Sequence, residues 1–543
     1  MVLGTGKTAL FVVLIHLIVP CLSSKMLKNF DLGSDLSKKT GNLLFGVSAS
    51  DYSGFSVSNV GDFNGDGYDD IVIGAPYADP ENKNISGECY LVFGSSSFGN
   101  KKGKIQLSTI ADTDRSGAVS GFVMTGENIG DQFGWFVSSA GDFNGDGYND
   151  IIIGAPYASS GAGASYLIFG GATVGATGSE LQMADLDGSN GFVLNGVSSS
   201  DYSGNSVSNA GDFNNDGYDD VLIGAYGADP NSVSSSGASY LVYGGSSVGS
   251  SGSLDLSTLD GSNGFVINGL STKDYSGYSV SGAGDMNNDT YADVIIGAYG
   301  GDPNSLSGSG ESYVLFGGSS VGSSGTLELS SLTGSNGFVL NGADQGDRSG
   351  FSVSSAGDFN GDGYDDIIIG AYRADGGSTS SVGESYVVYG GSTVGSSGVI
   401  ELGDLDGTDG FQLVGIKEDD KSGSSVSGAG DINADGYDDV IIGAYNAKNE
   451  RGESYVVYGT SNISTSRLKL DELGGQVGTT IKGNSRDDYS GYSVSCAGDF
   501  NGDGRDDVII GAYGGGTYET GETYILTNLF RQSSSSSSSG MST

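Results

Sequence analysis

The sequence DFNGDGYDD at residues 62–70 recurs in six further, slightly varied copies along the chain, and this recurrence is the main evidence for the fold. Successive copies begin 80, 70, 73, 73, 73 and 68 residues apart. So steady a period indicates one structural unit repeated seven times. The other copies are DFNGDGYND at 142–150, DFNNDGYDD at 212–220, DMNNDTYAD at 285–293, DFNGDGYDD at 358–366, DINADGYDD at 431–439 and DFNGDGRDD at 499–507.

The spacing of oxygen donors in this stretch is typical of a calcium loop. In the first copy, Asp62, Asn64 and Asp66 alternate, and Asp70 closes the set at the ninth position. A glycine at the sixth position allows the turn that lets the carbonyl of Tyr68 face inward. Oxygen-only donors in a flexible loop suit calcium better than magnesium, which demands a strict octahedron and retains waters.

We therefore predict up to seven structural calcium ions, held at the first, third, fifth, seventh and ninth positions of each loop, the seventh through its carbonyl. A turn rich in Asp, Asn and Gly without a metal would explain one copy, but seven copies with the same donor positions favour ligation. The candidate ligands are Asp62, Asn64, Asp66, Tyr68, Asp70, Asp142, Asn144, Asp146, Tyr148, Asp150, Asp212, Asn214, Asp216, Tyr218, Asp220, Asp285, Asn287, Asp289, Tyr291, Asp293, Asp358, Asn360, Asp362, Tyr364, Asp366, Asp431, Asn433, Asp435, Tyr437, Asp439, Asp499, Asn501, Asp503, Arg505 and Asp507.

The loop differs from an EF-hand, which needs a Glu at the twelfth position and flanking helices. The twelfth position here is Ile73, and the flanks GFSVSNVG and IVIGA are β-like. The pattern thus predicts a calcium loop within a β-hairpin. The fourth copy is the weakest candidate, because Thr290 replaces the turn glycine and Ala292 removes an acid.

Each unit contains four short apolar or alternating segments separated by turn residues, with no helical period. In the fifth unit these are residues 337–342, 351–357, 366–372 and 384–390. We predict an all-β chain that forms a seven-bladed β-propeller of four-stranded antiparallel blades. The last unit ends after its third strand, so we expect Asn42 to Phe45 to complete the last blade and close the ring.

The repeats resemble the FG-GAP repeats that form the N-terminal propeller of integrin alpha subunits. The name-giving residues are Phe133-Gly134 and Gly154-Ala155-Pro156, with a metal loop between them. Elsewhere the FG becomes SG and the GAP mostly becomes GAY. The resemblance covers about residues 27–530, and it implies metal loops on the lower face of the propeller, ligand contacts on the upper face and extracellular adhesion. The chain lacks the leg domains and membrane segment of a complete subunit, so a beta-type partner is not implied.

The net charge and the two terminal segments restrict the possible functions further. The net charge is −43 without a basic cluster, which excludes nucleic acid and disfavours an anionic membrane as partner. Residues 1–24 are typical of a secretory signal, with a signal anchor as the alternative. We predict a secreted protein with no membrane span, in which residues 27–530 form the propeller and residues 531–543 a Ser-rich disordered tail.

Few side chains are available for other chemistry. His16, the only histidine, lies in the predicted signal segment, so the mature chain lacks His-based catalysis and His-ligated metals. Cys89 and Cys496 form either two buried thiols or, if their units meet, a disulfide. Glycosylation sequons at Asn84 and Asn462 are candidate surface glycans.

Three features leave alternatives open. The loops between the second and third strands differ from unit to unit; they are either binding loops or solvated loops that only connect the strands. Trp135, the only tryptophan, fills a gap between blades or stacks on a sugar. An Asp lies eleven residues before each metal loop. These residues either form a functional rim or, more simply, accept local backbone N–H bonds in turns. These residues are Asp51, Asp131, Asp201, Asp274, Asp347, Asp420 and Asp488.

The leading hypothesis is a secreted, calcium-stabilised propeller, not an enzyme, that binds an extracellular protein or glycan. A calcium-dependent polysaccharide-acting enzyme and a multivalent lectin are the alternatives. Seven near-equivalent units argue against the single asymmetric cluster that catalysis requires. The sequence leaves the ligand and the oligomeric state open.

Overall fold

The computed structural model describes residues 25–26, 28–37, 40–98, 104–110, 120–174, 180–375, 380–461 and 465–531. Strands are the main regular element of these residues; the described helical elements are nine three-residue 3-10 turns and two four-residue turns, α1 (Ala158–Gly161) and α2 (Ala447–Glu450). None of the helices described could span a bilayer. The predicted signal segment, Asn462 and residues 532–543 lie outside the described part of the chain.

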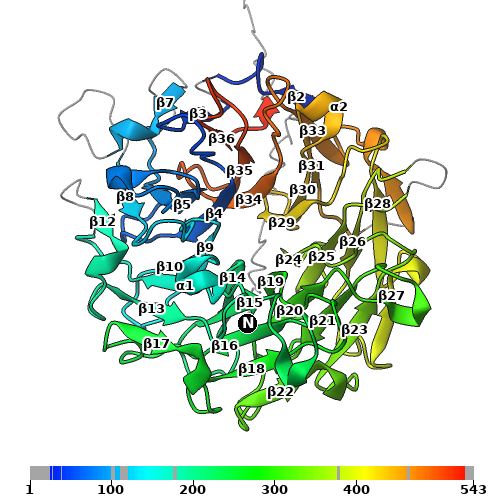
Figure 1. Cartoon of the computed structure of the whole chain (residues 1–543). Helices are drawn as coiled ribbons and strands as arrows, with labels where there is room; N and C mark the ends of the chain where they lie inside the picture. Colours follow the sequence, from blue (N-terminus) through cyan, green and yellow to red (C-terminus); the bar gives the residue numbers. More distant parts are fainter. Residues whose placement is uncertain are drawn as a thin grey trace, which may run out of the picture.

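Seven sheets stand around a central axis as the blades of a propeller, which confirms the predicted fold (Figure 1). In each blade the first strand lies nearest the axis, and it is followed outward by the second, third, fourth and fifth. The strands, from the axis outward, are β4 (Ser56–Gly61), β5 (Asp70–Ala75), β6 (Glu88–Val92), β8 (Gly121–Thr125) and β12 (Leu181–Gln182) in blade 1; β9 (Phe136–Gly141), β10 (Asp150–Ala155), β11 (Ala164–Ile168), β13 (Gly191–Asn195) and β17 (Ser253–Asp255) in blade 2; β14 (Ser206–Gly211), β15 (Asp220–Ala225), β16 (Ala238–Val242), β18 (Gly264–Asn268) and β22 (Thr326–Glu328) in blade 3; β19 (Ser279–Gly284), β20 (Asp293–Ala298), β21 (Glu311–Leu315), β23 (Gly337–Asn341) and β27 (Val399–Glu401) in blade 4; β24 (Ser352–Gly357), β25 (Asp366–Ala371), β26 (Glu384–Val388), β28 (Gly410–Val414) and β32 (Arg467–Lys469) in blade 5; β29 (Ser425–Gly430), β30 (Asp439–Ala444), β31 (Glu453–Val457), β33 (Gly478–Lys482) and β2 (Asn29–Asp31) in blade 6; and β34 (Ser493–Gly498), β35 (Asp507–Ala512), β36 (Glu522–Leu526), β3 (Asn42–Phe45) and β7 (Lys104–Gln106) in blade 7.

The blades have five strands where four were predicted. The first four strands are antiparallel, and the fifth pairs in parallel with the fourth, as β22 does with β18. The fifth strand belongs in sequence to the following unit, because the segment after the third strand of that unit returns to the previous blade. Each repeat is therefore built into two blades.

The N-terminal segment closes the ring as predicted. Strand β3 pairs antiparallel with β36 and becomes the fourth strand of blade 7, while β2 becomes the fifth strand of blade 6. Leu44 in β3 and Phe30 in β2 are fully buried. A further short pair joins β1 (Lys25–Met26) to β37 (Phe530–Arg531). The first and last parts of the described chain therefore lie together.

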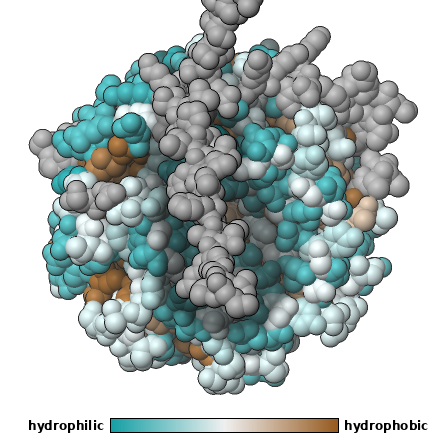
Figure 2. Space-filling view, turned by 180° about the vertical axis from the view of Figure 1, so that it is seen from behind, coloured by the Kyte–Doolittle hydropathy of each residue, from teal (hydrophilic) through white to brown (hydrophobic). Residues whose placement is uncertain are grey.

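The apolar core lies between the blades. All six residues of every second strand are buried, as in β25, because both faces of the blade pack against neighbours. The hydrophobic clusters accordingly join adjacent blades: Phe359 and Ile368 of blade 5 pack with Val440 and Ile442 of blade 6. Seen from behind, the described surface is largely hydrophilic, with small and separate hydrophobic areas (Figure 2).

Candidate functional site

The two faces of the ring carry different chemistry. Each first strand runs from what we call the upper face to the lower face, where the acidic nine-residue loop joins it to the second strand; in blade 1, residues 62–69 join β4 to β5. The loops between second and third strands and the turns that enter each blade lie on the upper face.

The first-position carboxylate organises each acidic loop. In blade 1, Asp62 Oδ1 accepts the Asp66 N–H at 2.9 Å and Asp62 Oδ2 accepts the Gly67 N–H at 2.8 Å. The third-position Asn64 Oδ1 accepts the same Asp66 N–H at 2.8 Å. The fourth loop keeps the first-position bonds, since Thr290 takes φ 80° and donates its N–H to Asp285 Oδ2 at 2.8 Å. The predicted donor residues are thus brought into one loop in each blade.

The ninth-position aspartate anchors the loop to the blade. Asp70 is fully buried; its two oxygens accept the Gly94 N–H at 2.9 Å and the Phe63 N–H at 3.1 Å. Burial, with smaller contributions from nearby Asp66 and Asp62, raises the pKa of Asp70 to about 8. Burial raises the pKa of its six equivalents in the same way, to about 9 in Asp439 and to about 8 in Asp150, Asp220, Asp293, Asp366 and Asp507.

The donor set fits a hard cation, on the evidence of oxygen atoms left without partners. The third-position Oδ1 is buried and accepts no hydrogen bond in Asn214, Asn287, Asn360 and Asn433, and the ninth-position Oδ2 is in the same state in Asp366 and Asp439. Within the described residues, no group of three or more Asp, Glu, Cys or His side chains is arranged to hold a metal ion; the Asp62 carboxylate accepts backbone N–H groups. The residues that would hold calcium remain those predicted.

The eighth-position aspartate has a role that the sequence did not reveal: it links neighbouring blades. In five junctions its Oδ2 accepts the first-position N–H of the preceding loop at 2.7–2.9 Å. The glycine before the loop makes room for it, since a Cβ on Gly498, at φ 61°, would lie 2.2 Å from Asp69 Oδ2. Asn149 and Ala292 stand at the other two positions. The bonds join Asp142 to Asp219, Asp285 to Asp365, Asp358 to Asp438, Asp431 to Asp506, and Asp499 to Asp69.

Asp69→Ala is expected to lower the free energy of unfolding by about 1–3 kcal/mol, because it leaves the Asp499 N–H without its acceptor at the closing junction. Ala292→Asp supplies the acceptor that the junction between blades 3 and 4 lacks, and it is expected to stabilise the chain by about 0.5–1.5 kcal/mol. Urea unfolding at fixed calcium concentration measures both. Ala292→Asn, with an amide at the same place, and Ala292→Leu, with no acceptor, are the controls; equal stability of all three variants at position 292 would refute the link.

Aromatic side chains form a continuous arc on the upper face around the axis. Their ring contacts run without a break from Tyr372 in blade 5, through blades 4, 3, 2, 1 and 7, to Tyr445 in blade 6. We call this set the aromatic arc. Its members are Tyr52, Phe55, Tyr77, Trp135, Tyr157, Tyr202, Tyr226, Tyr275, Tyr278, Tyr299, Phe351, Tyr372, Tyr445, Tyr489, Tyr492 and Tyr513.

Three kinds of position build the arc. The first two are the residue after the rim aspartate and the tyrosine that follows the second strand. These two rings stack in three blades, as Tyr489 and Tyr513 do with ring centroids 5.1 Å apart and an interplanar angle of 5°, and they meet edge-on in blade 1. The residue after the Ser-Gly or Phe-Gly turn points toward the axis. Trp135 is one of these residues; it is half-buried and also faces the axis. Its ring centroid lies 4.8 Å from that of Phe55 in blade 1 and 5.6 Å from that of Tyr157 in blade 2. It therefore bridges two blades and reaches the axial opening.

The rim aspartates stabilise turns beneath this arc. Asp51 Oδ2 accepts the Ser48 N–H at 2.8 Å, and the equivalents in five other blades accept the corresponding N–H. In blade 2, Asp131 accepts from the Asn128 side-chain amide at 3.1 Å. All seven are buried, which supports the structural interpretation of this regularity.

Serine side chains from the first strands form the wall of the axial opening. In six of the seven junctions the first serine of one blade accepts the valine N–H of the next blade at 3.0–3.1 Å; Ser56, for example, accepts from Val137. The seventh position is Phe136, which has no acceptor to offer to Val207. These serines hold neighbouring first strands together around the axis.

The two cysteines of the propeller are free thiols. Cys89 is fully buried in β6, and Cys496 is half-buried in β34. Burial raises the pKa of both. They therefore behave as small apolar side chains. Of the two predicted glycan acceptors, Asn84 is exposed on an upper-face loop, and glycosylation stays a prediction.

Comparison with known proteins matches each of the seven units. A family model described as "FG-GAP repeat" matches seven segments, each of which begins at the entry turn of a blade and ends in its third strand. The matched residues are 53–92, 133–168, 203–242, 276–315, 349–388, 422–457 and 490–526.

Several integrin alpha subunits are among the curated proteins similar to this chain. Mouse integrin alpha-IIb is 33% identical over 190 residues, which cover 34% of this chain and 16% of that protein. Integrin alpha-5 of Xenopus laevis is 28% identical over 245 residues, 44% of this chain and 20% of that protein. The chain thus spans a fifth or less of the length of these relatives. Among solved structures, Sqt1 from Chaetomium thermophilum matches 89% of this chain and 97% of its own at 10% identity and a TM-score of 0.41.

Proposed function

The chain belongs to the FG-GAP repeat family and is integrin-alpha-like, and on this premise we propose that it is a secreted, calcium-stabilised module that binds an extracellular ligand on its upper face. Its repeats make it an adhesion or recognition module in general. The observation that carries the proposal is the aromatic arc, because large half-buried rings gathered on one face are typical of contact surfaces.

The loops around the arc support this choice of face. The segments between second and third strands end on the same side as the arc, and they differ in length and composition from blade to blade. The frame beneath them is nearly identical in every blade. A rigid frame that presents variable loops around a common contact surface is the usual arrangement of a recognition scaffold.

Calcium would act on the opposite face as a structural ion. Residues at the first, third, fifth, seventh and ninth positions of each loop would hold it, and it would neutralise carboxylates that otherwise repel one another. A set of acidic loops far from the arc favours a supporting role for the metal.

An enzymatic role finds less support. The described residues that line the axial cavity include no carboxylate, lysine, arginine, cysteine or histidine, so its serine and tyrosine hydroxyls have no such partner there to activate them as nucleophiles or as acid–base groups. We therefore propose binding without catalysis.

The proposal is tested with fluorescent protein on the surface of the cells that produce it. Tyr202→Ala with Tyr275→Ala removes two rings of the arc that lie outside the axial cavity, and surface binding is expected to fall about tenfold or more. Tyr518→Ala, which removes a ring 80% exposed outside the arc, is the matched control. Unchanged binding by the double variant would refute the upper-face site.

A further inference from the structure

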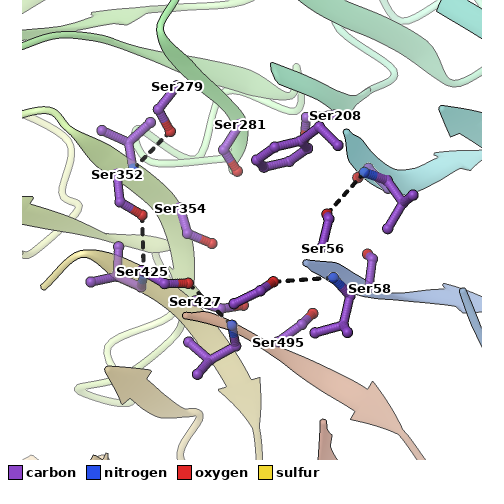
Figure 3. A pocket seen from close by; sticks show the side chains of 18 of the residues that line it. Ser56, Ser58, Ser208, Ser279, Ser281, Ser352, Ser354, Ser425, Ser427 and Ser495 are labelled. Carbon is purple, nitrogen blue, oxygen red and sulfur yellow. Dashed lines mark hydrogen bonds between the residues drawn. The ribbon is translucent and has the colours of Figure 1, made fainter. Parts of the chain in front are cut away.

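A cavity on the axis combines aromatic and hydroxyl groups without any charge. It has a volume of about 280 Å³ and is lined by the first strands of all seven blades. Figure 3 shows serine side chains of these strands around the opening. Phe55, Trp135, Tyr278, Phe351 and Tyr492 of the aromatic arc lie at its upper end. In a chain of net charge −43, the described lining contains no ionised side chain.

Four of the seven inner serines present acceptors rather than donors. Four hydroxyls, those of Ser58, Ser208, Ser281 and Ser427, donate to the backbone carbonyl of the following residue at 2.7–2.9 Å. Their lone pairs remain for a ligand. A ligand that satisfies these four hydroxyls must bring its own O–H or N–H donors, which ionised phosphate, sulfate and carboxylate groups do not supply.

The absence of charge also bears on cationic ligands. Burial of an ammonium or guanidinium group costs its hydration. A carboxylate would offset that cost, but the described lining provides none, and the aromatic faces at the upper end offset it only in part. Neutral hydroxyl groups meet the acceptors without that cost. The wall therefore favours a polyhydroxylated, uncharged ligand.

Phe136 breaks the symmetry of the cavity. Six blades carry serine at this position and use it to bond the next blade, whereas Phe136 gives up that bond and lies on the cavity wall beside Trp135. It is only half-buried. Blade 2 thus provides two adjacent rings, Trp135 and Phe136, that could stack against the C–H faces of a sugar.

We infer that the axial cavity binds the end of a neutral glycan chain, with Trp135 and Phe136 as stacking platforms and the serine wall accepting hydrogen bonds from sugar hydroxyls. The inference rests on the proposed function, because it names a ligand class for the centre of the same face. The cavity volume, near the lower limit for small-molecule sites, suits the end of a chain rather than a folded domain.

The fluorescence of Trp135 reports on the cavity directly, since it is the only tryptophan in the chain. The wild-type protein is titrated with neutral gluco-, manno-, galacto- and chito-oligosaccharides, and with sialylated and sulfated oligosaccharides and an arginine-containing peptide. At least one neutral series is expected to shift the emission saturably. Phe136→Ser, which introduces the residue of the other six blades, is expected to weaken that binding about tenfold.

Folding of the variant is checked separately. Phe136→Ser offers Val207 the acceptor it lacks, so its melting temperature is expected to stay near that of the wild type. Phe136→Leu keeps the apolar packing but removes the ring, and it is expected to lose the sugar as well. Tyr518→Ala, outside the cavity, is expected to bind like the wild type.

The outcomes separate this inference from the proposed function. Saturable shifts with the peptide or the anionic sugars but not with the neutral series, no shift at all, or full binding by both Phe136 variants would each overturn the glycan site. Cell-surface binding that depends on Tyr202 and Tyr275 would then still support the upper face. Sugar binding that depends on Phe136, together with surface binding unaffected at Tyr202 and Tyr275, would uphold the cavity and refute the wider site.

Discussion

Removal of calcium with EDTA is expected to lower the melting temperature by on the order of 10 °C. An ion that binds only the folded chain stabilises it by RT ln(1 + [L]/Kd), which is about 1.4 kcal/mol per site at a concentration ten times Kd. Seven sites would contribute about 10 kcal/mol together. Loops that bind calcium weakly suffice for this, because extracellular calcium concentrations are high. Calorimetric melts with and without EDTA, and a calcium titration for the number of sites, measure the effect.

Point variants locate the effect in the loops. Asp366→Asn removes a ninth-position carboxylate with an unpartnered oxygen, and it is expected to reduce the calcium-dependent shift more than Asp293→Asn in the fourth loop. Asp187→Asn changes an exposed acid outside the loops and serves as the control. A chain with the same melting temperature in calcium and in EDTA would disprove the structural role of the metal.

The dependence on pH has a definite sign. Burial raises the pKa of Asp70 to about 8, so the folded chain binds a proton there that the unfolded chain has released above its ordinary pKa near 4. Without calcium, this group stabilises the fold at acidic pH, and the stabilisation is lost as the pH rises toward 8. Calcium bound at this loop would replace the proton, so the calcium-dependent shift is expected to grow over the same range.

Deletion of residues 27–46 is expected to remove cooperative unfolding or to lower stability severely. The deletion takes β2 from blade 6 and β3 from blade 7. It exposes the partners of Phe30, Leu32, Leu43 and Leu44, all buried, whose burial contributes on the order of 8 kcal/mol together. It also leaves β36 as an unpaired edge, which is prone to association.

A single substitution keeps this prediction measurable if the deletion does not fold. Leu44→Ala is expected to cost about 3 kcal/mol, because the side chain is fully buried between blades. Val47→Ala, three residues on and 41% exposed, is expected to change stability by less than about 0.5 kcal/mol. Urea denaturation compares the two; equal stability would mean that the N-terminal strand does not fasten the ring.

The sequence predicted those parts of the fold whose signal repeats seven times. The order of the first four strands and the position of the acidic loops followed from period and turn chemistry, and closure by Asn42 to Phe45 followed because the last unit ends after its third strand. The fifth strand did not, because three residues such as Thr326 to Glu328 carry no periodic signal, and their partner lies in another unit. Pairing of so short a segment is decided by the path of the chain.

The site was predictable to a different degree on each face. Donor residues of the acidic loops are defined by local spacing, so they could be named without a structure. Asp69 could not be distinguished from a ligand, because its bond to Asp499 joins residues 430 positions apart. The aligned repeats show Phe136 where the six other units carry serine, but only the ring of first strands shows that this position lines the axial cavity.

The pairing of the chain ends has a mechanical consequence. Tension applied between residues 25 and 531 would first meet the two-residue pair of β1 and β37, and then β2 and β3 in blades 6 and 7. Blades 1 to 5 contain no strand from this N-terminal segment. Under load the ring would therefore open where blades 6 and 7 meet. The other five blades would keep every strand, so the ring could close again when the force is released.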